Sequence, residues 1–219
     1  PGNSAKECVM EQFTLDQTSP DIVISGVKDK SANRGNVAPV VTISDTNLSA
    51  DTVQVTLTGA NTGEHEIHAM ASVHTQKGRM VVRFYDFAKG MDDIYTLSCK
   101  AVDKAGNETK SAIRFSVNRD GSAYEIDEAT QKLLEQRYIR QPKDIVITEI
   151  NKDDLCLTEI SYSLEGKVVV LKQGSDYTIE KSGQEDQWKT YRYHIRASCF
   201  QKEGTYVINV YSEDAANNR

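Results

Sequence analysis

The stretch Tyr95-Thr-Leu-Ser-Cys-Lys-Ala-Val-Asp-Lys-Ala-Gly-Asn107 is matched by Tyr206-Val-Ile-Asn-Val-Tyr-Ser-Glu-Asp-Ala-Ala-Asn-Asn218. An offset of 111 residues (206 minus 95) superposes three identical positions in the second half: Asp103 on Asp214, Ala105 on Ala216 and Asn107 on Asn218. Each copy starts with aromatic, β-branched and aliphatic residues, which favour strands, and ends with residues that favour turns. One strand-and-turn unit therefore occurs twice in the sequence, which predicts two modules of the same fold.

One position within the repeated turn differs in an informative way. Gly106 is matched by Asn217. Glycine, followed by asparagine, is the residue that most readily adopts a positive φ, so the backbone is expected to turn there in both copies. The Asp that precedes each turn can accept backbone N–H bonds in an Asx-turn. We therefore interpret the motif as a structural turn and not as a metal site.

Strand signals dominate the rest of the chain. Most candidate strands are short and bounded by Gly, Asn or Asp: residues 21–25, 37–44, 52–58, 80–87, 94–102, 113–117, 144–148, 167–171, 188–195 and 205–211. Only residues 128–138 have the pattern of a helix, which Pro142 follows. The predicted fold class is all-β, with two tandem antiparallel β-sandwich modules and a short helix near the junction between them.

Two further similarities indicate where the modules begin. Residues Asp21-Ile-Val-Ile-Ser25 are echoed by Asp144-Ile-Val-Ile-Thr148, which suggests that both modules open with the same strand. Near the start of the chain, Phe13-Thr-Leu-Asp16 resembles Phe115-Ser-Val-Asn118, and Gly2-Asn3 resembles Gly106-Asn107. The chain is therefore expected to start within a repeat.

This frame divides the chain into three parts. Residues 1–18 are expected to hold the closing strand of a preceding repeat and a linker, residues 19–118 the first module, and residues 119–219 a second module that lacks its last strand. A strand within residues 6–15 would then be free to pair with the second module of another molecule.

Composition excludes some classes of partner. The formal net charge is −6, and the Lys and Arg residues are spread along the chain without forming a basic stripe. Binding to nucleic acid needs such a stripe, so we expect no nucleic-acid partner. The sequence has no run of 18 apolar residues, so we expect no membrane insertion.

The repeated stretch, together with Phe13-Thr-Leu-Asp-Gln-Thr-Ser-Pro20, resembles the bacterial Ig-like repeats of large surface proteins of Gram-positive bacteria. The resemblance covers most of residues 1–118 and, more weakly, residues 144–219. It implies an extracellular location, on the bacterial cell surface or secreted, with modules strung into a stalk. The implied partners are a host glycan or protein, or neighbouring repeats of the same protein.

The expected function is therefore that of a non-catalytic structural or adhesive Ig-like repeat segment. The alternative is a carbohydrate-binding module, or accessory domains of a large secreted glycan-active enzyme. No Gly-x-Ser-x-Gly elbow, phosphate-binding loop or Cys/His nucleophile pair occurs in the sequence. His65-Glu-Ile-His68 departs from the metalloprotease motif because its histidines are three residues apart instead of four. We interpret it as a polar strand and hairpin loop, and expect no catalytic residue and no metal ligand there.

Two kinds of residue leave alternatives open. The cysteines Cys8, Cys99, Cys156 and Cys199 either pair or are buried thiols, and a disulfide between Cys156 and Cys199 is favoured because both belong to the second module. Oxygen ligands that suit Ca²⁺ occur near predicted loops, at Asp45, Asn47, Asp51, Asp92, Asp93 and Asp120. They form no recognisable loop motif, and Asp and Asn belong in turns in any case. No cofactor is therefore expected, with Ca²⁺ as the one candidate.

A ligand platform is the remaining candidate site. Trp188, Tyr191 and Tyr193 are aromatic, and exposed rings give a sugar or a protein a flat surface with a polar edge. However, the period of a strand places Tyr191 and Tyr193 on one face and Trp188 on the other. The face with the two tyrosines is expected to be a buried core, with the ligand platform as the less favoured alternative.

Overall fold

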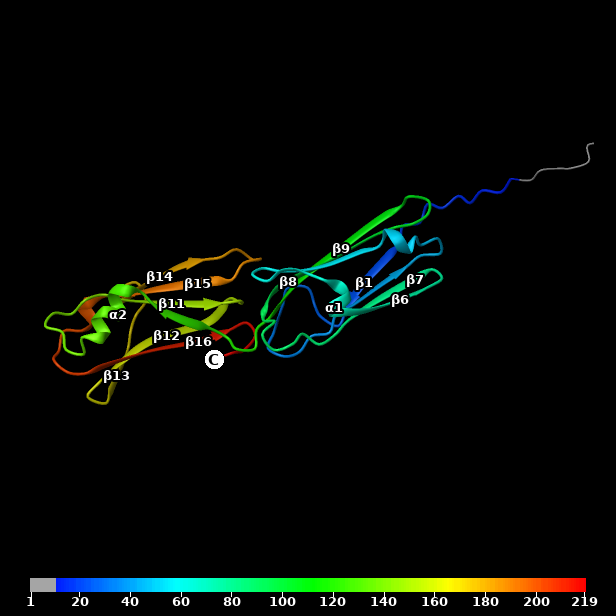
Figure 1. Ribbon diagram of the computed structural model, residues 1–219. Helices are drawn as coiled ribbons and strands as arrows, with labels where there is room; N and C mark the ends of the chain where they lie inside the picture. Colours follow the sequence, from blue (N-terminus) through cyan, green and yellow to red (C-terminus); the bar gives the residue numbers. More distant parts are fainter. Residues whose placement is uncertain (1–10) are drawn as a thin grey trace, which may run out of the picture.

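The computed structural model describes residues 11–219, and they form two β-sandwich modules that lie end to end (Figure 1). Module 1 comprises strands β1–β9 and module 2 comprises strands β10–β16. In the described part of the chain, no helix is both long and apolar enough to cross a membrane. Residues 11–20 precede the first strand and have no regular secondary structure, so the closing strand expected within residues 1–18 is not formed in its described part; residues 1–10 lie outside the described residues.

Module 1 contains nine strands and two short helical turns, in this order: β1 (Asp21–Ser25), β2 (Ser31–Asn33), β3 (Val40–Ser44), η1 (Ala50–Thr52), β4 (Gln54–Gly59), β5 (Gly63–His65), α1 (Ile67–Met70), β6 (Ala71–Gln76), β7 (Arg79–Phe84), β8 (Asp93–Val102) and β9 (Glu108–Val117).

Module 2 contains seven strands, one α-helix and one 3₁₀ turn: β10 (Ala123–Ile126), α2 (Glu128–Glu135), β11 (Ile145–Asn151), β12 (Leu155–Leu164), β13 (Lys167–Val170), β14 (Tyr177–Ser182), β15 (Lys189–Ile195), η2 (Ala197–Cys199) and β16 (Tyr206–Asp214).

The sheets of the two modules follow one plan. Module 1 has a four-stranded sheet in the order β1-β3-β7-β6 and a five-stranded sheet in the order β2-β9-β8-β4-β5. Module 2 has sheets in the orders β10-β11-β15-β14 and β13-β12-β16. The pairing is antiparallel except for the short β2–β9 ladder. The prediction of tandem antiparallel sandwiches is therefore confirmed, and β8 and β16 occupy equivalent places.

Each module buries its own core. In module 1 the rings of Phe87, Tyr95 and Phe115 pack together between the sheets. In module 2 the core includes Tyr193 and Ile160, both fully buried. Burying such rings is the main favourable contribution to folding for a sandwich of this size.

A tyrosine at the start of the repeated strand anchors the preceding loop in both modules. Tyr95 donates its hydroxyl hydrogen to the carbonyl oxygen of Met91 over 2.6 Å. Tyr206 donates in the same way to the carbonyl oxygen of Lys202 over 2.8 Å. This contact, from a strand's first tyrosine to the backbone a few residues upstream, is typical of Ig-like sandwiches.

The expected match between the opening strands of the modules is wrong. Residues 21–25 form β1, the edge strand of the first sheet, but residues 144–148 fall at the start of β11, whose counterpart is β3. The true counterpart of β1 is β10, which was not predicted. Short β-branched runs recur at many strand positions, so similarity over five residues did not identify the position in the sheet.

The predicted helix is present, but it is shorter than expected and does not lie near the junction in space. It ends at Glu135 instead of residue 138, and Arg137 has a positive φ of 60°, which stops the helix. Asp127 caps its first turn by accepting a hydrogen bond from the Thr130 amide. The helix follows the junction along the chain, but in space it lies toward the end of module 2 that points away from module 1 (Figure 1).

Candidate functional site

The repeated turn has the same geometry in both modules. The Asp103 carboxylate accepts hydrogen bonds from the backbone amides of Ala105 and Asn107, each over 2.8 Å. Asp214 accepts from Ala216 and Asn218 in the same way, each over 2.9 Å. Gly106 and Asn217 both have positive φ, 92° and 62°. The motif therefore forms the expected turn in both modules.

The last residue of each turn has a second role, which is to hold the linker that enters the module. In module 2 the side-chain amide of Asn218 donates to the carbonyl oxygen of Asn118 over 2.8 Å. In module 1 the Asn107 amide donates to the carbonyl oxygen of Asp16 over 3.2 Å. Asn118 and Asp16 are the equivalent residues that the sequence aligned. Each module therefore receives its incoming linker on this turn.

Asn118 lies at the centre of the junction between the modules and is fully buried. Its side-chain amide donates to Asn151, Asp153 and Asp214, over 2.9, 3.0 and 3.0 Å. Its side-chain oxygen accepts from the Gly121 amide over 3.1 Å. The backbone amide of Asn118 donates to the carbonyl oxygen of Asn33 in module 1. One asparagine thus connects groups from both modules without leaving its own polar atoms unpaired.

Asp153 extends this network back into module 1. Its carboxylate accepts from the Ser116 hydroxyl over 2.5 Å as well as from Asn118. Burial raises the pKa of Asp153, and the nearby negative charge of Asp214 acts in the same direction. The hydrogen bonds from Ser116 and Asn118 oppose that shift by stabilising the charged form.

A second contact crosses the junction at the hairpin loop between β14 and β15. Trp188 donates its indole N–H to the Asp93 carboxylate of module 1 over 2.7 Å. Asp93 is fully buried and also accepts from the amides of Asn61 and Thr62. Burial alone would raise the pKa of Asp93, but these hydrogen bonds, with that from Trp188 the largest, lower it. Asp93 is therefore held as a carboxylate that faces the second module.

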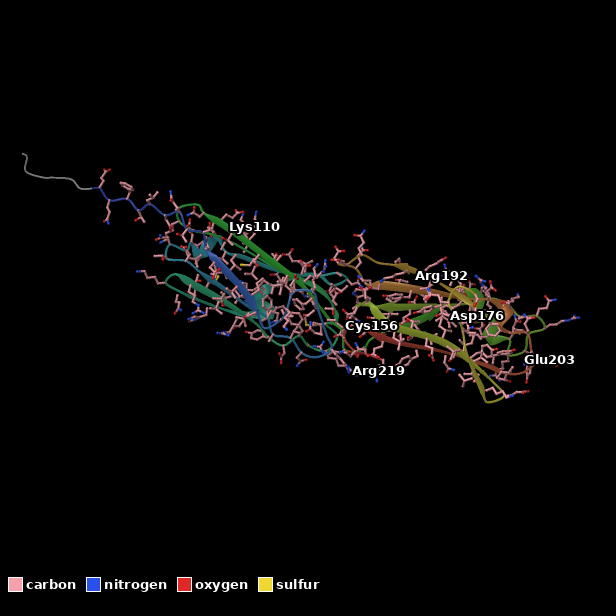
Figure 2. All side chains as sticks on the ribbon, turned by 180° about the vertical axis from the view of Figure 1, so that it is seen from behind. Lys110, Cys156, Asp176, Arg192, Glu203 and Arg219 are labelled. Carbon is pink, nitrogen blue, oxygen red and sulfur yellow. The ribbon has the colours of Figure 1, made fainter. Side chains whose placement is uncertain are left out.

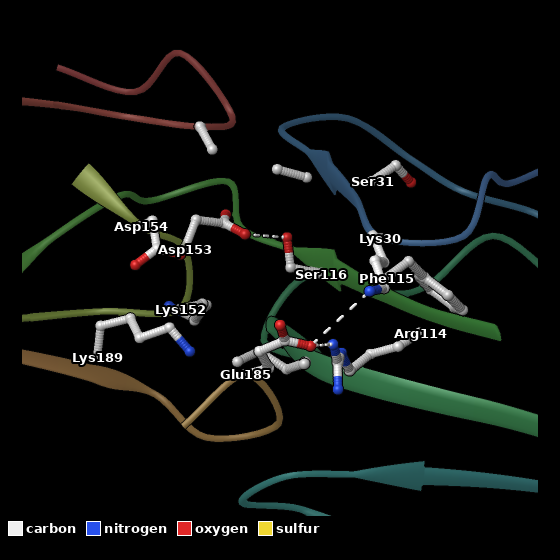
Figure 3. Close-up of a pocket in the computed structure, with 13 residues that line it drawn as sticks. Lys30, Ser31, Arg114, Phe115, Ser116, Lys152, Asp153, Asp154, Glu185 and Lys189 are labelled. Carbon is white, nitrogen blue, oxygen red and sulfur yellow. Dashed lines mark hydrogen bonds and ion pairs between the residues drawn. The ribbon is translucent and has the colours of Figure 1, made fainter. Parts of the chain in front are cut away.

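Charged side chains surround a small cavity beside this contact (Figure 3). Glu185 of module 2 pairs with Arg114 of module 1, and Lys30 lies 4.0 Å from the same carboxylate. The cavity measures about 240 Å³ and is also lined by Lys152, Lys189 and Asp153 among others. A larger pocket, of about 570 Å³, shares Arg114, Asp154, Glu185 and Lys189 with this cavity. Among the charges around it, the pairing of Arg114 and Lys30 with Glu185 joins the two modules.

The end of module 1 that points away from module 2 has an arrangement of side chains like that around Asn118 at the junction, but with more carboxylates. The carboxylates of Asp16, Asp45 and Asp103 each offer an oxygen within 4.8 Å of the others. Asn47 donates its amide to Asp16 over 2.6 Å. The residues in the corresponding places at the junction are Asn118, Asn151 and Asp214, so two amides replace two carboxylates there. Binding of Ca²⁺ stays a prediction. Of the predicted Ca²⁺ ligands, Asp45 belongs to this group of carboxylates and Asn47 contacts it through Asp16.

The other predicted Ca²⁺ ligands do not gather at one place. Asp92 pairs with Arg119 over 2.5 Å, and Asp93 accepts from Trp188 as described above. Asp51 is exposed in η1, and Asp120 is exposed in the linker. The structure therefore assigns Asp92 and Asp93 to the junction between modules and does not join these four residues in a site.

The proposed ligand platform is not formed. Tyr191 and Tyr193 are buried in the core of module 2, and the Tyr193 hydroxyl donates to the buried Glu149 over 2.5 Å. Trp188 is half-buried at the junction, where the Lys152 ammonium lies 4.6 Å from the centre of its ring. Strand alternation separated the three rings as expected. Neither face is open to a flat ligand, because one is core and the other is occupied by module 1 and Lys152.

The favoured disulfide between Cys156 and Cys199 is also wrong. Both residues are free thiols, as is the buried Cys99. Cys156 is exposed near the junction, whereas Cys199 donates to the carbonyl oxygen of Asp176, which lies at the opposite end of module 2 (Figure 2). Shared membership of a module did not place the two within bonding reach. The remaining cysteine, Cys8, lies outside the described residues.

The His65–His68 segment differs from the predicted strand and hairpin loop. His65 ends β5, but His68 lies in the four-residue helix α1. The His65 ring is 2.9 Å from the Thr62 hydroxyl and packs against Tyr95. His65 therefore takes part in side-chain packing of module 1.

Sequence reasoning missed the junction itself. Asn118 and Asp93 are polar residues at the ends of predicted strands, which is where turn residues also occur. The repeat did contain one usable signal, since the pair Asp16 and Asn118 precedes a module in both copies. That alignment identified a linker, but it gave no indication that the side chain of Asn118 is buried.

No protein-family model matches this sequence, and no curated protein resembles it in sequence. Among solved structures, the chain aligns with the titin Ig tandem A164-A165 at 9% identity and a TM-score of 0.41, over 90% of this chain and 95% of that one. It aligns with titin A168169 at 10% identity and a TM-score of 0.37, over 89% and 95% of the chains. By its strand order, the chain is a tandem of Ig-like β-sandwich modules.

Proposed function

We propose that this chain is a non-catalytic structural repeat segment that holds two Ig-like modules in a fixed, extended arrangement. The observation that carries the proposal is the burial of Asn118 between the modules, with hydrogen bonds to Asn151, Asp153 and Asp214. Two modules joined by an exposed linker are expected to move relative to each other. A fully buried linker residue that is bonded to the following module restricts that motion.

The strength of the junction comes from several bonds that act together. Besides Asn118, the Ser116–Asp153 and Trp188–Asp93 hydrogen bonds join module 1 to module 2. Each such bond contributes roughly 0.5–1.5 kcal/mol after water exchange is counted, and bonds to charged groups contribute more. Together they exceed thermal energy several-fold, so the open arrangement is a minor state.

The wider setting follows from the sequence resemblance. Residues 95–107 and 13–20 resemble bacterial Ig-like surface repeats, and this supports an extracellular location on a bacterial surface. Within such a protein, the partners would be the neighbouring repeats that continue the row. The junction supports a role as a spacer, because a rigid module pair keeps whatever follows it at a constant distance from the surface.

Small-angle X-ray scattering tests the proposal. The 219-residue chain should scatter as a rod of constant length, with no sign of hinge motion. Asn118→Ala should broaden the distribution of intramolecular distances. Both cores should stay folded in this variant, which urea unfolding checks independently. Asn209→Ala, which removes an exposed asparagine of β16, is the matched control and should scatter like the wild type. A compact globule, or an Asn118→Ala variant as extended and rigid as the wild type, would contradict the proposal.

A further inference from the structure

The cavity between the modules, here called the junction cavity, is lined by four cationic side chains and three carboxylates. Lys30 and Arg114 belong to module 1, and Lys152 and Lys189 belong to module 2 (Figure 3). The adjoining larger pocket shares Arg114 and Lys189 with it. The whole chain has a formal net charge of −6, so this excess of positive charge is a local property of the junction.

The carboxylates of the junction cavity are all bonded to side chains other than Lys152 and Lys189. These bonds join Glu185 to Arg114 and Lys30, Asp154 to Lys181, and Asp153 to Ser116 and Asn118. Among the described residues, no carboxylate forms an ion pair with Lys152 or Lys189. Two positive charges that line the junction cavity are therefore left without a paired negative charge.

Lys189 is the most buried of these cations, with only 5% of its surface exposed at the start of β15. Its ammonium donates to the carbonyl oxygens of Gln184 and Gln187 in the loop between β14 and β15. An ammonium has three N–H donors, so one of them has no acceptor among the described residues. Burial lowers the pKa of Lys189 more than the negative charge of Asp154 raises it. The protein therefore compensates this buried charge only in part, which is costly unless an anion binds beside it.

We propose that the junction cavity binds a tetrahedral oxyanion, sulfate or phosphate, between Lys189 and Lys152 of module 2 and Arg114 of module 1. Donors that approach from two modules need a ligand whose acceptors point in several directions. The oxygens of a sulfate or phosphate group do so, whereas the two oxygens of a carboxylate lie in one plane. The fork of Arg114 offers two parallel N–H donors to such a group, and the two ammonium groups act as point charges.

Glu185 competes with the oxyanion for Arg114. Its carboxylate bonds the Arg114 guanidinium, yet the side chain of Glu185 is 74% exposed. Because so little of this side chain is packed, it can turn into water when another anion binds Arg114. Glu185 thus acts as the anion of the protein itself at this place. An oxyanion that replaces it contacts both modules and stabilises the junction in proportion to its concentration.

Heteronuclear NMR of the 219-residue chain tests the inference. Trp188 is the only tryptophan, and the Lys152 ammonium lies 4.6 Å from the centre of its ring, so the single indole N–H signal reports on the cavity. Sodium sulfate or sodium phosphate is titrated, while sodium chloride keeps the ionic strength constant. The indole signal and the amide signal of Lys189 should shift and reach saturation together. Signals that stay in place, or that shift without saturation, would overturn the inference.

Variants separate binding in the cavity from general screening of charge. Lys152→Gln, at a half-buried position, should bind sulfate about tenfold more weakly. Glu185→Gln removes the competing carboxylate and should bind sulfate about fivefold more tightly. Lys167→Gln, at an exposed lysine of β13, is the matched control and should bind like the wild type. Wild-type affinity in Lys152→Gln, or affinity in Glu185→Gln no tighter than in the wild type, would contradict the assigned site.

A sugar sulfate distinguishes a free ion from a sulfate ester on a glycan. N-acetylglucosamine 6-sulfate is titrated beside inorganic sulfate, with unsulfated N-acetylglucosamine as the control. Affinity for the sugar sulfate that is more than about tenfold higher assigns the site to a glycan sulfate ester, and equal affinity assigns it to the free oxyanion. Shifts of the same signals by the unsulfated sugar would overturn the inference, because the cavity would then recognise something other than the anion.

Discussion

The indole N–H of Trp188 in module 2 donates to the buried carboxylate of Asp93 in module 1, over 2.7 Å. These residues lie 95 positions apart in the chain, and their contact joins two separately built cores. Asp93 keeps its charge through donors from both modules. The junction is therefore a shared polar network and not an apolar patch.

Trp188 is the only tryptophan of the chain, so its fluorescence reports on the junction directly. Replacing Asp93 by Asn weakens the acceptor and sets an N–H₂ group among donors. We expect Asp93→Asn to shift the emission of Trp188 to longer wavelength and to increase its quenching by acrylamide. Asp51→Asn, at an exposed carboxylate of module 1, should leave both unchanged. Equal quenching of wild type and Asp93→Asn would contradict the assigned role of Asp93.

A fall in pH should weaken the contribution of Asp93 to the free energy of unfolding. Its pKa lies below the ordinary value of 3.8 in the folded protein, because hydrogen bonds from Trp188, Thr62 and Asn61 outweigh burial. A carboxylate of this kind stabilises the fold above its ordinary pKa, and that stabilisation is lost as the pH falls through the lower folded value. We expect the difference in unfolding free energy between wild type and Asp93→Asn to shrink from about pH 6 to about pH 3. Urea unfolding at both pH values measures it, and a constant difference would exclude this linkage.

Substitutions at Gly106 distinguish the effect of backbone strain from that of side-chain crowding. Its φ is positive, yet a Cβ placed there meets no atom within 4 Å. We expect Gly106→Ala to destabilise the protein by about 1–2 kcal/mol from backbone strain alone. Gly106→Asn should cost less, since Asn217 holds the same place in module 2. Chemical denaturation of both variants decides the matter, and an equal loss for Ala and Asn would contradict the equivalence of the turns.

The free thiols should differ in reactivity. Burial raises the pKa of Cys99 to about 11, so it is protected both by lack of access and by lack of thiolate. Cys156 is exposed and free. Alkylation of the folded protein followed by mass spectrometry should label Cys156 and leave Cys99 unlabelled until urea is added. Recovery of a Cys156–Cys199 disulfide from the folded protein would contradict the structure.

The sequence predicted local features well and long-range ones poorly. The turn at Gly106 and Asn217 was predictable because positive φ has a strong residue preference. Strands β12 and β14 were missed although both contain a short stretch of alternating apolar and polar residues, Ile160–Leu164 in β12 and Tyr177–Glu180 in β14. The burial of Asn118 could not be predicted, because it depends on acceptors up to 96 residues away in the chain. The predicted disulfide was wrong for a related reason, since membership of one module does not set the distance between two residues across a sandwich.

Residual dipolar couplings measure the orientation of the two modules most directly. If the network around Asn118 and the Trp188–Asp93 bond fixes the junction, one alignment tensor should fit the backbone amides of both modules in the wild type. Asn118→Ala should split this into two tensors of different magnitude. Separate tensors for the two modules in the wild type would mean that they move independently, and would contradict the rigid junction on which this account depends.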